Sequence, residues 1–235
     1  MIKDIDVLVL CGGEGKRLRK ISGKAPKPMV RIGRKVFLDI IIDYLRKSGF
    51  KRIILGIGYQ AQFIKKYYCE HKIQGIEIVF SEEKTPLGTG GAVKKAKRLI
   101  KSESFLVLNG DTFSKFNADK FIKAYKQNKA KLLLLLRKAK SSQDYGAISI
   151  DKQSRITSFN EKPESGAGNF VNGGVYLFSQ KAFPEMPKQT KFSLEYDFFP
   201  KMIGKGLYGY KESGFFIDIG TPERYSRAEK YFLKT

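Results

Sequence analysis

The sequence has no hydrophobic run near the ~20 residues that a membrane-spanning helix needs, so no transmembrane segment is expected. Its N-terminus, MIKDIDVLVLCGG, carries an acid within the short apolar run and has no small-residue cleavage site, which argues against a signal peptide. The two cysteines, Cys11 and Cys69, lack metal-ligand spacing, and we expect free, buried thiols in a reducing cytoplasm. The single histidine, His71, has no assignable role and is expected at the surface.

Acidic residues are scarce: 45 lysines and arginines against 23 aspartates and glutamates give a formal net charge of +22. Such a charge suggests an anionic partner, either nucleic acid or a polyphosphate substrate. The lysines are nevertheless scattered over nearly every segment, and neither a repeated aromatic–basic pattern nor a nucleic-acid-binding motif is present. A generally basic composition with solvated helix faces is the simpler explanation. We predict no nucleic-acid partner and no membrane partner.

The 235 residues suit one compact domain, without linker, low-complexity segment or internal repeat. In the first ~110 residues, short apolar runs typical of buried strands alternate with segments of helical periodicity. The predicted strands are 5–10, 52–58, 76–81 and 104–111, and the predicted helices are 37–49, 62–71 and 91–101. This alternation predicts parallel βαβ units and an α/β, doubly wound sheet, whose ligands bind at the carboxyl ends of its strands.

The second half has a different pattern. YGAISID, RITSFNEKP and FVNGGVYLFS are predicted strands without intervening helices, and we expect an antiparallel or mixed extension laid over one edge of the sheet. Residues 193–203 predict a helix, capped by Ser193 and kinked or restarted at Pro200. After a last buried strand over 215–220, the chain closes with a helix capped by Thr221.

The stretch LVLCGGEGKRLR (8–19) leaves a buried strand, passes three glycines and then gathers cations in a predicted helix start. Exposed backbone N–H groups at such a point can cradle a phosphate chain, and Lys16, Arg17 and Arg19 supply matching charge. The stretch lacks the Gly-Lys-Ser/Thr of a P-loop and the spacing of a dinucleotide fingerprint. From these residues alone, an ordinary structural turn remains an alternative.

Two further loops add to this pattern. In KAPKPMV (24–30), Lys27 lies between two prolines that restrict the backbone, so it is either a solvated lysine or an aimed catalytic cation. TPLGTGGAV (85–93) is a second glycine-rich loop, which offers backbone groups suited to a base edge or serves as a flexible connector.

Two aspartates end predicted strands. Asp111 follows LVLNG, and Asp218 interrupts the apolar run FFIDIG. An acid within an apolar strand costs several kcal/mol unless it is paired or metal-bound. Two carboxylates beside phosphate-binding cations fit one Mg²⁺ ion shared with substrate phosphates, although either could instead form a turn or cap a helix.

In their order and spacing, LCGGEGKRL, PKPMV, PLGTGGA, NGD, EKP and IDIGTPE resemble the motifs of the sugar-1-phosphate nucleotidylyltransferases. The resemblance covers nearly the whole chain and implies a Rossmann-like doubly wound mixed sheet with a strand-rich sugar-binding extension. It implies an Mg²⁺-dependent attack of a sugar 1-phosphate on the α-phosphorus of a nucleoside triphosphate, which releases pyrophosphate. Because the attacking phosphate is already anionic, positioning and charge neutralisation suffice, without a general base.

The resemblance assigns candidate residues to each part of the site. The catalytic residues would be Arg17 for the leaving pyrophosphate, Lys27 for the α-phosphate, and Asp111 and Asp218 for the metal. The nucleotide would contact Leu10, Gly12, Gly13, Gly15, Lys16, Arg17, Glu83, Pro86, Gly88, Thr89, Asn109 and Gly110. The sugar phosphate would contact Tyr145, Gly146, Glu161, Lys162, Asn172 and Gly173. The family commonly has Thr where this chain has Lys16, so a hydroxyl contact is lost there and a cation gained.

Within the family, PLGTGGA and the short chain are most similar to the enzymes that transfer GMP to D-glycero-α-D-manno-heptose 1-phosphate, followed by those that use mannose 1-phosphate. The resemblance of TPLGTGGA to this branch makes GTP the expected donor. Glu83 supports it physically, because its carboxylate can accept from N1–H and N2–H₂ of guanine, although a solvent-facing Glu83 remains the alternative. UTP, dTTP and CTP enzymes, and a non-catalytic sugar-nucleotide-binding subunit, remain alternatives. We expect one domain with a nucleotide-binding half (1–115) and a sugar-binding half (116–235), and a homodimer remains open.

Overall fold

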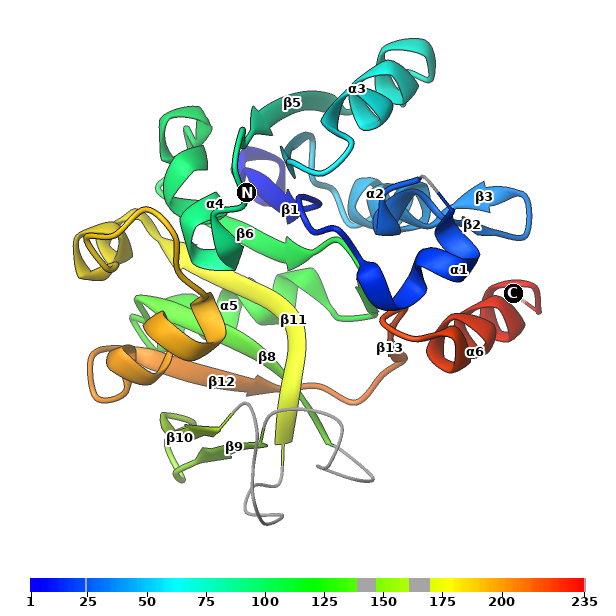
Figure 1. The fold of residues 1–235 in the computed structure, drawn as a ribbon. Coiled ribbons are helices and arrows are strands. Elements are labelled where there is room, and N and C mark those ends of the chain that lie inside the picture. The colour runs from blue at the N-terminus through cyan, green and yellow to red at the C-terminus, as the bar shows by residue number, and fades with distance from the viewer. Residues whose placement is uncertain (24, 139–146, 161–169, 235) are drawn as a thin grey trace.

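A computed structural model describes residues 1–23, 25–138, 147–160 and 170–234, and Figure 1 shows its ribbon. Within these ranges, nine strands form one mixed sheet and two pairs of short strands lie outside it. The strands are β1 (Val7–Leu10), β2 (Arg31–Ile32), β3 (Lys35–Val36), β4 (Arg52–Ile57), β5 (Glu77–Glu82), β6 (Ser104–Asn109), β7 (Thr112–Ser114), β8 (Leu132–Lys138), β9 (Ala147–Ile150), β10 (Ile156–Asn160), β11 (Phe170–Ser179), β12 (Leu207–Lys211) and β13 (Phe216–Asp218).

The first half forms the predicted parallel sheet. β1 pairs in parallel with β4 on one side and with β6 on the other, and β5 pairs in parallel with β4. The chain thus moves outward from β1 to β4 and β5 and then returns to start β6 beside β1. Reversal of the strand order places a topological switch point between the carboxyl ends of β1 and β6, where ligands bind in open α/β sheets.

The second half continues this sheet and does not lie over its edge, so the predicted placement of the extension is wrong. β11 pairs antiparallel with β6, and β8 and β9 both pair antiparallel with β11. β12 then pairs in parallel with β8, and β10 pairs antiparallel with β9. Residues 175–178 of β11 are 0–1% exposed, and a strand buried on both faces belongs inside a sheet.

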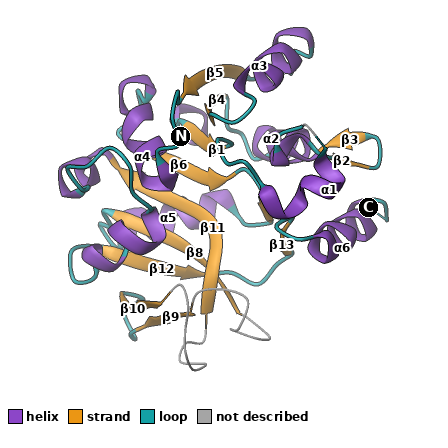
Figure 2. Cartoon of the chain, viewed as in Figure 1, coloured by secondary structure: helices purple, strands orange, loops and turns teal. Residues whose placement is uncertain are grey.

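The helices cover both faces of the sheet (Figure 2). They are α1 (Arg19–Ser22), α2 (Phe37–Lys47), α3 (Ala61–Glu70), α4 (Gly88–Ala96), α5 (Ala118–Gln127) and α6 (Pro222–Phe232). Successive side chains of β1 enter opposite cores because a strand alternates its faces. Val7 and Val9 pack with α2, α3, α5 and α6, whereas Leu8 packs with α4 and with the segment 182–202.

Most predicted helix boundaries are close to those observed, with two differences. α4 begins at Gly88, three residues before the predicted start, and the glycine-rich loop therefore forms its first turns. The predicted helix over 193–203 is a π-helical turn (Leu194–Phe198) followed by a 3-10 turn (Pro200–Met202). Ser193 caps the first turn as predicted, and Thr221 caps α6. Pro200 has no N–H for a continuing helix, which explains the break.

Cys69 contradicts the prediction of a buried thiol: it is exposed on α3, whereas Cys11 is buried at the end of β1. Ile64 and Tyr68 form the core-facing side of α3, and the next residue along the helix therefore turns toward solvent. His71 is exposed, as predicted. Within the described residues, no helix has the length and apolar character needed to cross a membrane.

Candidate active site

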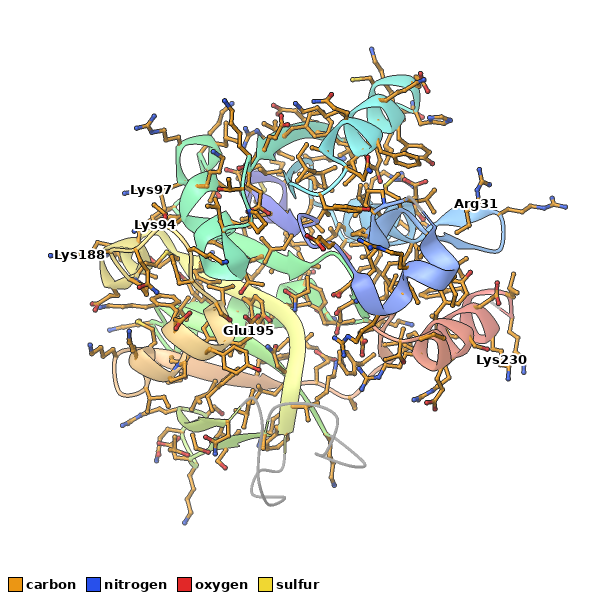
Figure 3. The ribbon with its side chains drawn as sticks, in the orientation of Figure 1. Arg31, Lys94, Lys97, Lys188, Glu195 and Lys230 are labelled. Atoms are coloured by element: carbon orange, nitrogen blue, oxygen red, sulfur yellow. The ribbon has the colours of Figure 1, made fainter. Side chains whose placement is uncertain are left out.

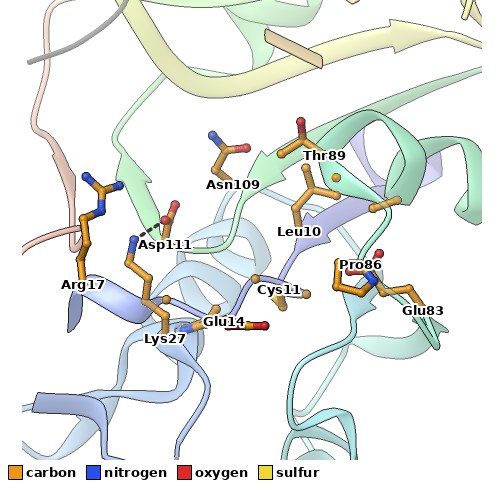
Figure 4. A pocket seen from close by; sticks show the side chains of 17 residues that line it. Leu10, Cys11, Glu14, Arg17, Lys27, Glu83, Pro86, Thr89, Asn109 and Asp111 are labelled. Atoms are coloured by element: carbon orange, nitrogen blue, oxygen red, sulfur yellow. Dashed lines mark hydrogen bonds and ion pairs between the residues drawn. The ribbon is translucent and has the colours of Figure 1, made fainter. Parts of the chain in front are cut away.

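A cavity of about 560 Å³ opens at the switch point of the sheet (Figure 4). Its wall comes from the end of β1, the loop 12–17, the 27–28 turn, the segment 83–92 that leads into α4, and the end of β6. The lining residues are Leu10, Cys11, Gly12, Gly13, Glu14, Gly15, Arg17, Lys27, Pro28, Glu83, Pro86, Gly88, Thr89, Ala92, Asn109, Asp111 and Gly220. Candidate nucleotide residues from three separate motifs therefore meet around one space.

The first glycine loop follows β1 directly into this cavity. Gly15 has a φ of +60°, and a Cβ there would lie 2.7 Å from Lys27 Cβ, so the turn requires glycine. A Cβ at Gly13 would meet nothing within 4 Å, which leaves room beside the backbone for a ligand. The chain then forms a 3-10 turn (Lys16–Leu18) and the short α1. Arg17 lines the cavity from this turn, and its guanidinium stands opposite Asp111 in Figure 4.

Lys27 and Asp111 form an ion pair inside the cavity, with 2.5 Å between Lys27 Nζ and Asp111 Oδ2. Pro26 and Pro28 flank Lys27 in a 3-10 turn, and its side chain is only 11% exposed. The proline-flanked turn thus directs this lysine into the cavity, and its catalytic role stays a prediction. Burial opposes ionisation of Asp111, but the charge and hydrogen bond of Lys27, with a second hydrogen bond from Thr112, hold the pKa of Asp111 below its ordinary value.

Asp218 lies next to this pair through strand pairing. In the antiparallel β7–β13 pair, Asp218 is opposite Thr112, and Ile219 N–H donates to the carbonyl of Asp111. A Cβ at Gly220 would lie 2.6 Å from Asp218 Oδ1 and 3.6 Å from Lys27 Nζ. Both oxygens of Asp218 also accept from Arg224 Nη1, at 3.1 and 3.0 Å. The sequence patterns identified Asp218 and missed its partner Arg224, which directly follows the motif IDIGTPE.

The two carboxylates fit a magnesium site of the open kind. Within the described residues, no group of three or more His, Cys, Asp or Glu side chains is placed to hold a metal. Mg²⁺ is usually bound by one or two carboxylates, with substrate phosphates and water completing the shell. Asp111 and Asp218 meet that requirement, because Asp111 lines the cavity directly before β7 and Asp218 lies on β13, which pairs with β7.

Glu83 lines the opposite side of the cavity. Its Oε2 accepts from Leu87 N–H at 2.9 Å, while Oε1 faces the backbone of Gly12 and Gly58. A Cβ at Gly12 would lie 1.9 Å from that oxygen, so this glycine makes room for the carboxylate. Burial raises the pKa of Glu83, with the Leu87 hydrogen bond opposing the shift. The carboxylate therefore belongs to the cavity wall and does not point to solvent.

The second glycine loop is tied to the rest of the fold more tightly than a flexible connector would be. Gly90 and Gly91 both donate their N–H groups to the carbonyl of Phe192, and a Cβ at Gly90 would lie 2.2 Å from the Phe192 ring. These two N–H groups thus bond to the Phe192 carbonyl and do not face a base. Gly88 and Thr89, earlier in the loop, line the cavity.

The remaining predicted residues are distributed as follows. Gly110 packs closely on the Leu10 carbonyl and does not line the cavity, and the side chain of Lys16 is not described. Asn172 and Gly173 lie on β11, where Asn172 Nδ2 donates to the Tyr176 hydroxyl. The other acceptor-side candidates, Tyr145, Gly146, Glu161 and Lys162, lie outside the described residues. Cys11, Glu14, Pro28, Ala92 and Gly220 also line the cavity and were not predicted.

Comparison with known proteins decides the family. The family description "Nucleotidyl transferase" matches residues 6–235, nearly the entire chain. The chain belongs to the nucleotidyl transferase family. The predicted family resemblance and the predicted enzymatic class are therefore confirmed, and the α/β fold class agrees with solved structures of the family.

Among its relatives in the nucleotidyl transferase family, D-glycero-α-D-manno-heptose 1-phosphate guanylyltransferase of Aneurinibacillus thermoaerophilus is 40% identical, over 96% of this chain and 97% of that protein. Mannose-1-phosphate guanylyltransferase of Mycobacterium tuberculosis is 29% identical, over 95% of this chain and 63% of that protein. The crystal structure of HddC from Yersinia pseudotuberculosis superposes with a TM-score of 0.87 at 37% identity, over 97% of this chain and 99% of that chain. HddC has also been solved in complex with GMP-PN (TM-score 0.85, 36% identity, 97% and 99% coverage).

Proposed function

We propose that this nucleotidyltransferase transfers GMP from GTP to a sugar 1-phosphate, and that the sugar is D-glycero-α-D-manno-heptose. The observation that carries the guanine assignment is the Glu83 carboxylate in the cavity wall, where one oxygen is held by Leu87 N–H. A carboxylate accepts from the paired N1–H and N2–H₂ donors of guanine, which uracil and thymine do not offer. The heptose assignment rests on the 40% identity to a heptose 1-phosphate guanylyltransferase.

The cavity offers a division of roles for this reaction. An oxygen of the sugar phosphate attacks the α-phosphorus of GTP, the bond from that phosphorus to the bridging oxygen breaks, and pyrophosphate leaves. Gly12, Gly13 and Gly15 would cradle the phosphates, Lys27 would neutralise charge at the α-phosphate, and Arg17 would hold the leaving pyrophosphate. No proton needs to be removed from the anionic nucleophile, so alignment and charge neutralisation carry the catalysis.

Magnesium completes this proposal. Asp111 and Asp218 would hold the ion, which supplies positive charge to the triphosphate oxygens when bound. Lys27 and Arg224 form ion pairs with these carboxylates and fix their positions. In this proposal, residues 1–115 bind the nucleotide and residues 116–235 bind the sugar phosphate. Tyr145, Gly146, Glu161, Lys162, Asn172 and Gly173 are the proposed acceptor residues.

One experiment distinguishes this function from the related activities with other nucleotides or sugars and from a non-catalytic role. The protein is incubated with Mg²⁺, each of the five nucleotides GTP, ATP, UTP, CTP and dTTP, and a panel of sugar 1-phosphates, while pyrophosphate release is measured. We expect the highest kcat/KM for GTP with the heptose 1-phosphate. A preference for mannose 1-phosphate changes the sugar alone, and a preference for another nucleotide refutes the guanine assignment. Sugar-nucleotide binding without any turnover would instead support a regulatory subunit.

A further inference from the structure

Glu195 receives hydrogen bonds from α4, from β11 and from the cap of its own turn, although it lies outside the set of residues that line the cavity. Its Oε2 accepts from Thr89 Oγ1 at 2.7 Å and from Ser193 Oγ at 2.7 Å, and its Oε1 accepts from the Tyr176 hydroxyl at 3.5 Å. Glu195 belongs to the 194–198 turn, and Figure 3 shows it beside β11, below α4. We propose that Glu195 is a positioning residue that makes Thr89 a hydrogen-bond acceptor for substrate hydroxyls. This inference rests on the proposed function.

The bonds of Thr89 fix the direction of its hydroxyl. A hydroxyl has one proton and two lone pairs. The proton is committed to Glu195 Oε2, because a carboxylate oxygen only accepts. One lone pair is committed to Leu194 N–H, which donates to Thr89 Oγ1 at 2.8 Å. Thr89 lines the cavity, and the capacity left to it is a single lone pair. It can therefore accept one hydrogen bond from a ligand and donate none.

The hydroxyl of Tyr176 also donates to Glu195 and accepts from other residues. It donates toward Glu195 and accepts from Asn172 Nδ2 at 2.8 Å and from Asn109 Nδ2 at 3.3 Å. Asn172 has its orientation fixed independently, because its Oδ1 accepts from Gly174 N–H. Asn109 Nδ2 carries two protons, and one of them is used in this bond. Its Oδ1 is buried and has no hydrogen-bond partner among the described residues. Asn109 also lines the cavity, so the bonds of Tyr176 orient a second polar side chain of the same wall.

A fixed hydrogen-bond acceptor in the cavity wall, such as Thr89 Oγ1, favours ligands that carry hydrogen-bond donors. Hydroxyl groups are the donors that both substrates of the proposed reaction carry: the ribose of the nucleotide has two, and the acceptor sugar has several. A site whose acceptors are fixed in this way leaves them unpaired when a ligand hydroxyl is missing, and that loss weakens binding. Glu195 would thus contribute to substrate recognition without touching the substrate.

The test uses variants that keep shape and change hydrogen bonding. Glu195→Ala removes the acceptor, and Glu195→Gln restores it because an amide oxygen can replace Oε2. Thr89→Val removes the hydroxyl at nearly constant shape, and Thr89→Ser keeps it. Glu185→Ala is the matched control, since Glu185 pairs only peripherally with Lys131 and does not line the cavity. For each variant, kcat and KM are measured separately for GTP and for the sugar 1-phosphate that wild type accepts.

We expect Glu195→Ala and Thr89→Val each to lower kcat/KM about tenfold for the same substrate, mainly through KM. Glu195→Gln and Thr89→Ser should recover most of the loss seen in Glu195→Ala and Thr89→Val, and Glu185→Ala should stay within about threefold of wild type. If Glu195 acts through Thr89, the double variant Glu195→Ala/Thr89→Val is no worse than Thr89→Val alone. An effect on the KM of GTP identifies the ribose as the donor, and an effect on the KM of the sugar phosphate identifies the sugar.

Several results would overturn the inference: wild-type kinetics in Glu195→Ala, loss of activity in Glu195→Gln equal to that in Glu195→Ala, or multiplicative effects in the double variant. If Glu195→Ala does not fold, Thr89→Val and Thr89→Ser decide, and equal kinetics of these two refutes the inference. If wild type turns over no substrate, the proposed function fails by itself. Calorimetric binding of GTP with Mg²⁺, and of each sugar 1-phosphate, to the same variants then tests Glu195, and equal affinity for every ligand in all of them refutes its role.

Discussion

Glu83 is both the proposed guanine-binding residue and a partly buried carboxylate. Its carboxylate lies beside Gly12 and Gly58, where solvent is partly excluded, and burial raises its pKa. A carboxylate with a raised pKa takes up its proton at a higher pH than an ordinary glutamate. Since only the ionised group accepts from both guanine donors, GTP affinity should decline as the pH falls toward that raised pKa.

We predict that Glu83→Gln keeps the fold and loses the preference for GTP. The amide oxygen of the glutamine can still accept from Leu87 N–H. Because burial raises the pKa of Glu83, ionisation of its carboxyl group at neutral pH costs stability in the folded protein. The melting temperature at neutral pH should therefore be unchanged or higher, while kcat/KM for GTP falls at least about tenfold. Thermal melts and GTP kinetics at several pH values check both points. Unchanged discrimination between GTP and UTP would contradict the role of Glu83.

The two aspartates make a second prediction at this scale. Asp111→Asn and Asp218→Asn should each lower kcat about a hundredfold or more, because each removes one proposed ligand of the metal and the charge partner of a cation. The measurement is turnover across a Mg²⁺ titration, together with circular dichroism to establish folding. Asp119→Asn, on the exposed start of α5, is the control. Near-normal turnover of either variant at saturating Mg²⁺ would show that its aspartate is not a ligand.

At the scale of elements, α4 and the segment 190–195 form one packed unit. Phe192 N–H donates to the carbonyl of Leu87, and the Phe192 carbonyl accepts from the N–H groups of Gly90 and Gly91. Lys94 Nζ donates to the carbonyls of Pro187 and Lys188. The glycines of PLGTGGA permit this close approach. Substitution of one of them therefore changes the position of Thr89 and Glu195 together.

We predict that Gly90→Ala destabilises the protein by about 1–3 kcal/mol, although alanine is the better helix former. The added Cβ would lie 2.2 Å from the Phe192 ring, so the helix or the ring must move. Denaturant unfolding measures the loss, and Lys95→Ala on the exposed face of α4 should leave stability unchanged. The double variant Gly90→Ala/Phe192→Leu should recover part of the loss if the ring is the obstacle. Stability of Gly90→Ala equal to wild type would refute this packing explanation.

At the scale of the molecule, a buried acid joins the strands at the end of the sheet opposite the cavity. Asp6 precedes β1 and is 5% exposed. It accepts from Arg52 Nη1 at 2.9 Å and from the N–H groups of Lys101 and Ser102 at 2.5 and 3.0 Å. Burial opposes its ionisation, but these backbone and arginine hydrogen bonds keep the pKa of Asp6 below its ordinary value.

We predict that Asp6→Asn lowers the free energy of unfolding by about 3–5 kcal/mol, because Arg52 loses its buried partner. Since the folded pKa lies below the unfolded one, Asp6 stabilises the fold above the unfolded pKa and loses this effect as the pH falls through the folded pKa. Unfolding of wild type and variant should therefore converge in acid. Asp4→Asn, at an exposed residue, is the control, and an Asp6→Asn variant as stable as this control would contradict the prediction.

The net charge of +22 also belongs to this scale. Figure 3 shows labelled cations on distant parts of the surface: Lys94, Lys97 and Lys188 lie together on one side, and Arg31 and Lys230 lie far from them. In the cavity, by contrast, Arg17 and Lys27 are placed by particular turns. The cations that matter for a phosphate substrate are thus selected by position and not by their number.

The sequence by itself determined the elements and the order of the motifs. Some signals depend only on neighbours along the chain and can therefore be recognised in the sequence. They are apolar runs of strand length, helix caps such as Ser193 and Thr221, and glycines at turns. The rule that ligands bind at the carboxyl ends of parallel strands then placed Gly13 and Asp111 at one site. These local and topological signals were sufficient for the fold class and for bringing the glycine loop and Asp111 to one cavity.

Only the tertiary structure decided contacts between distant segments. The insertion of β11 beside β6 depends on burial of both its faces, which a list of strands does not encode. Thr89 and Glu195 are 106 positions apart, and neither residue alone indicates that one orients the other. Arg224 resembles any exposed helical arginine until the turn after β13 brings it onto Asp218. Hydrogen bonding is short-ranged and directional, so such partners follow from where the backbone places them and not from the pattern of residues.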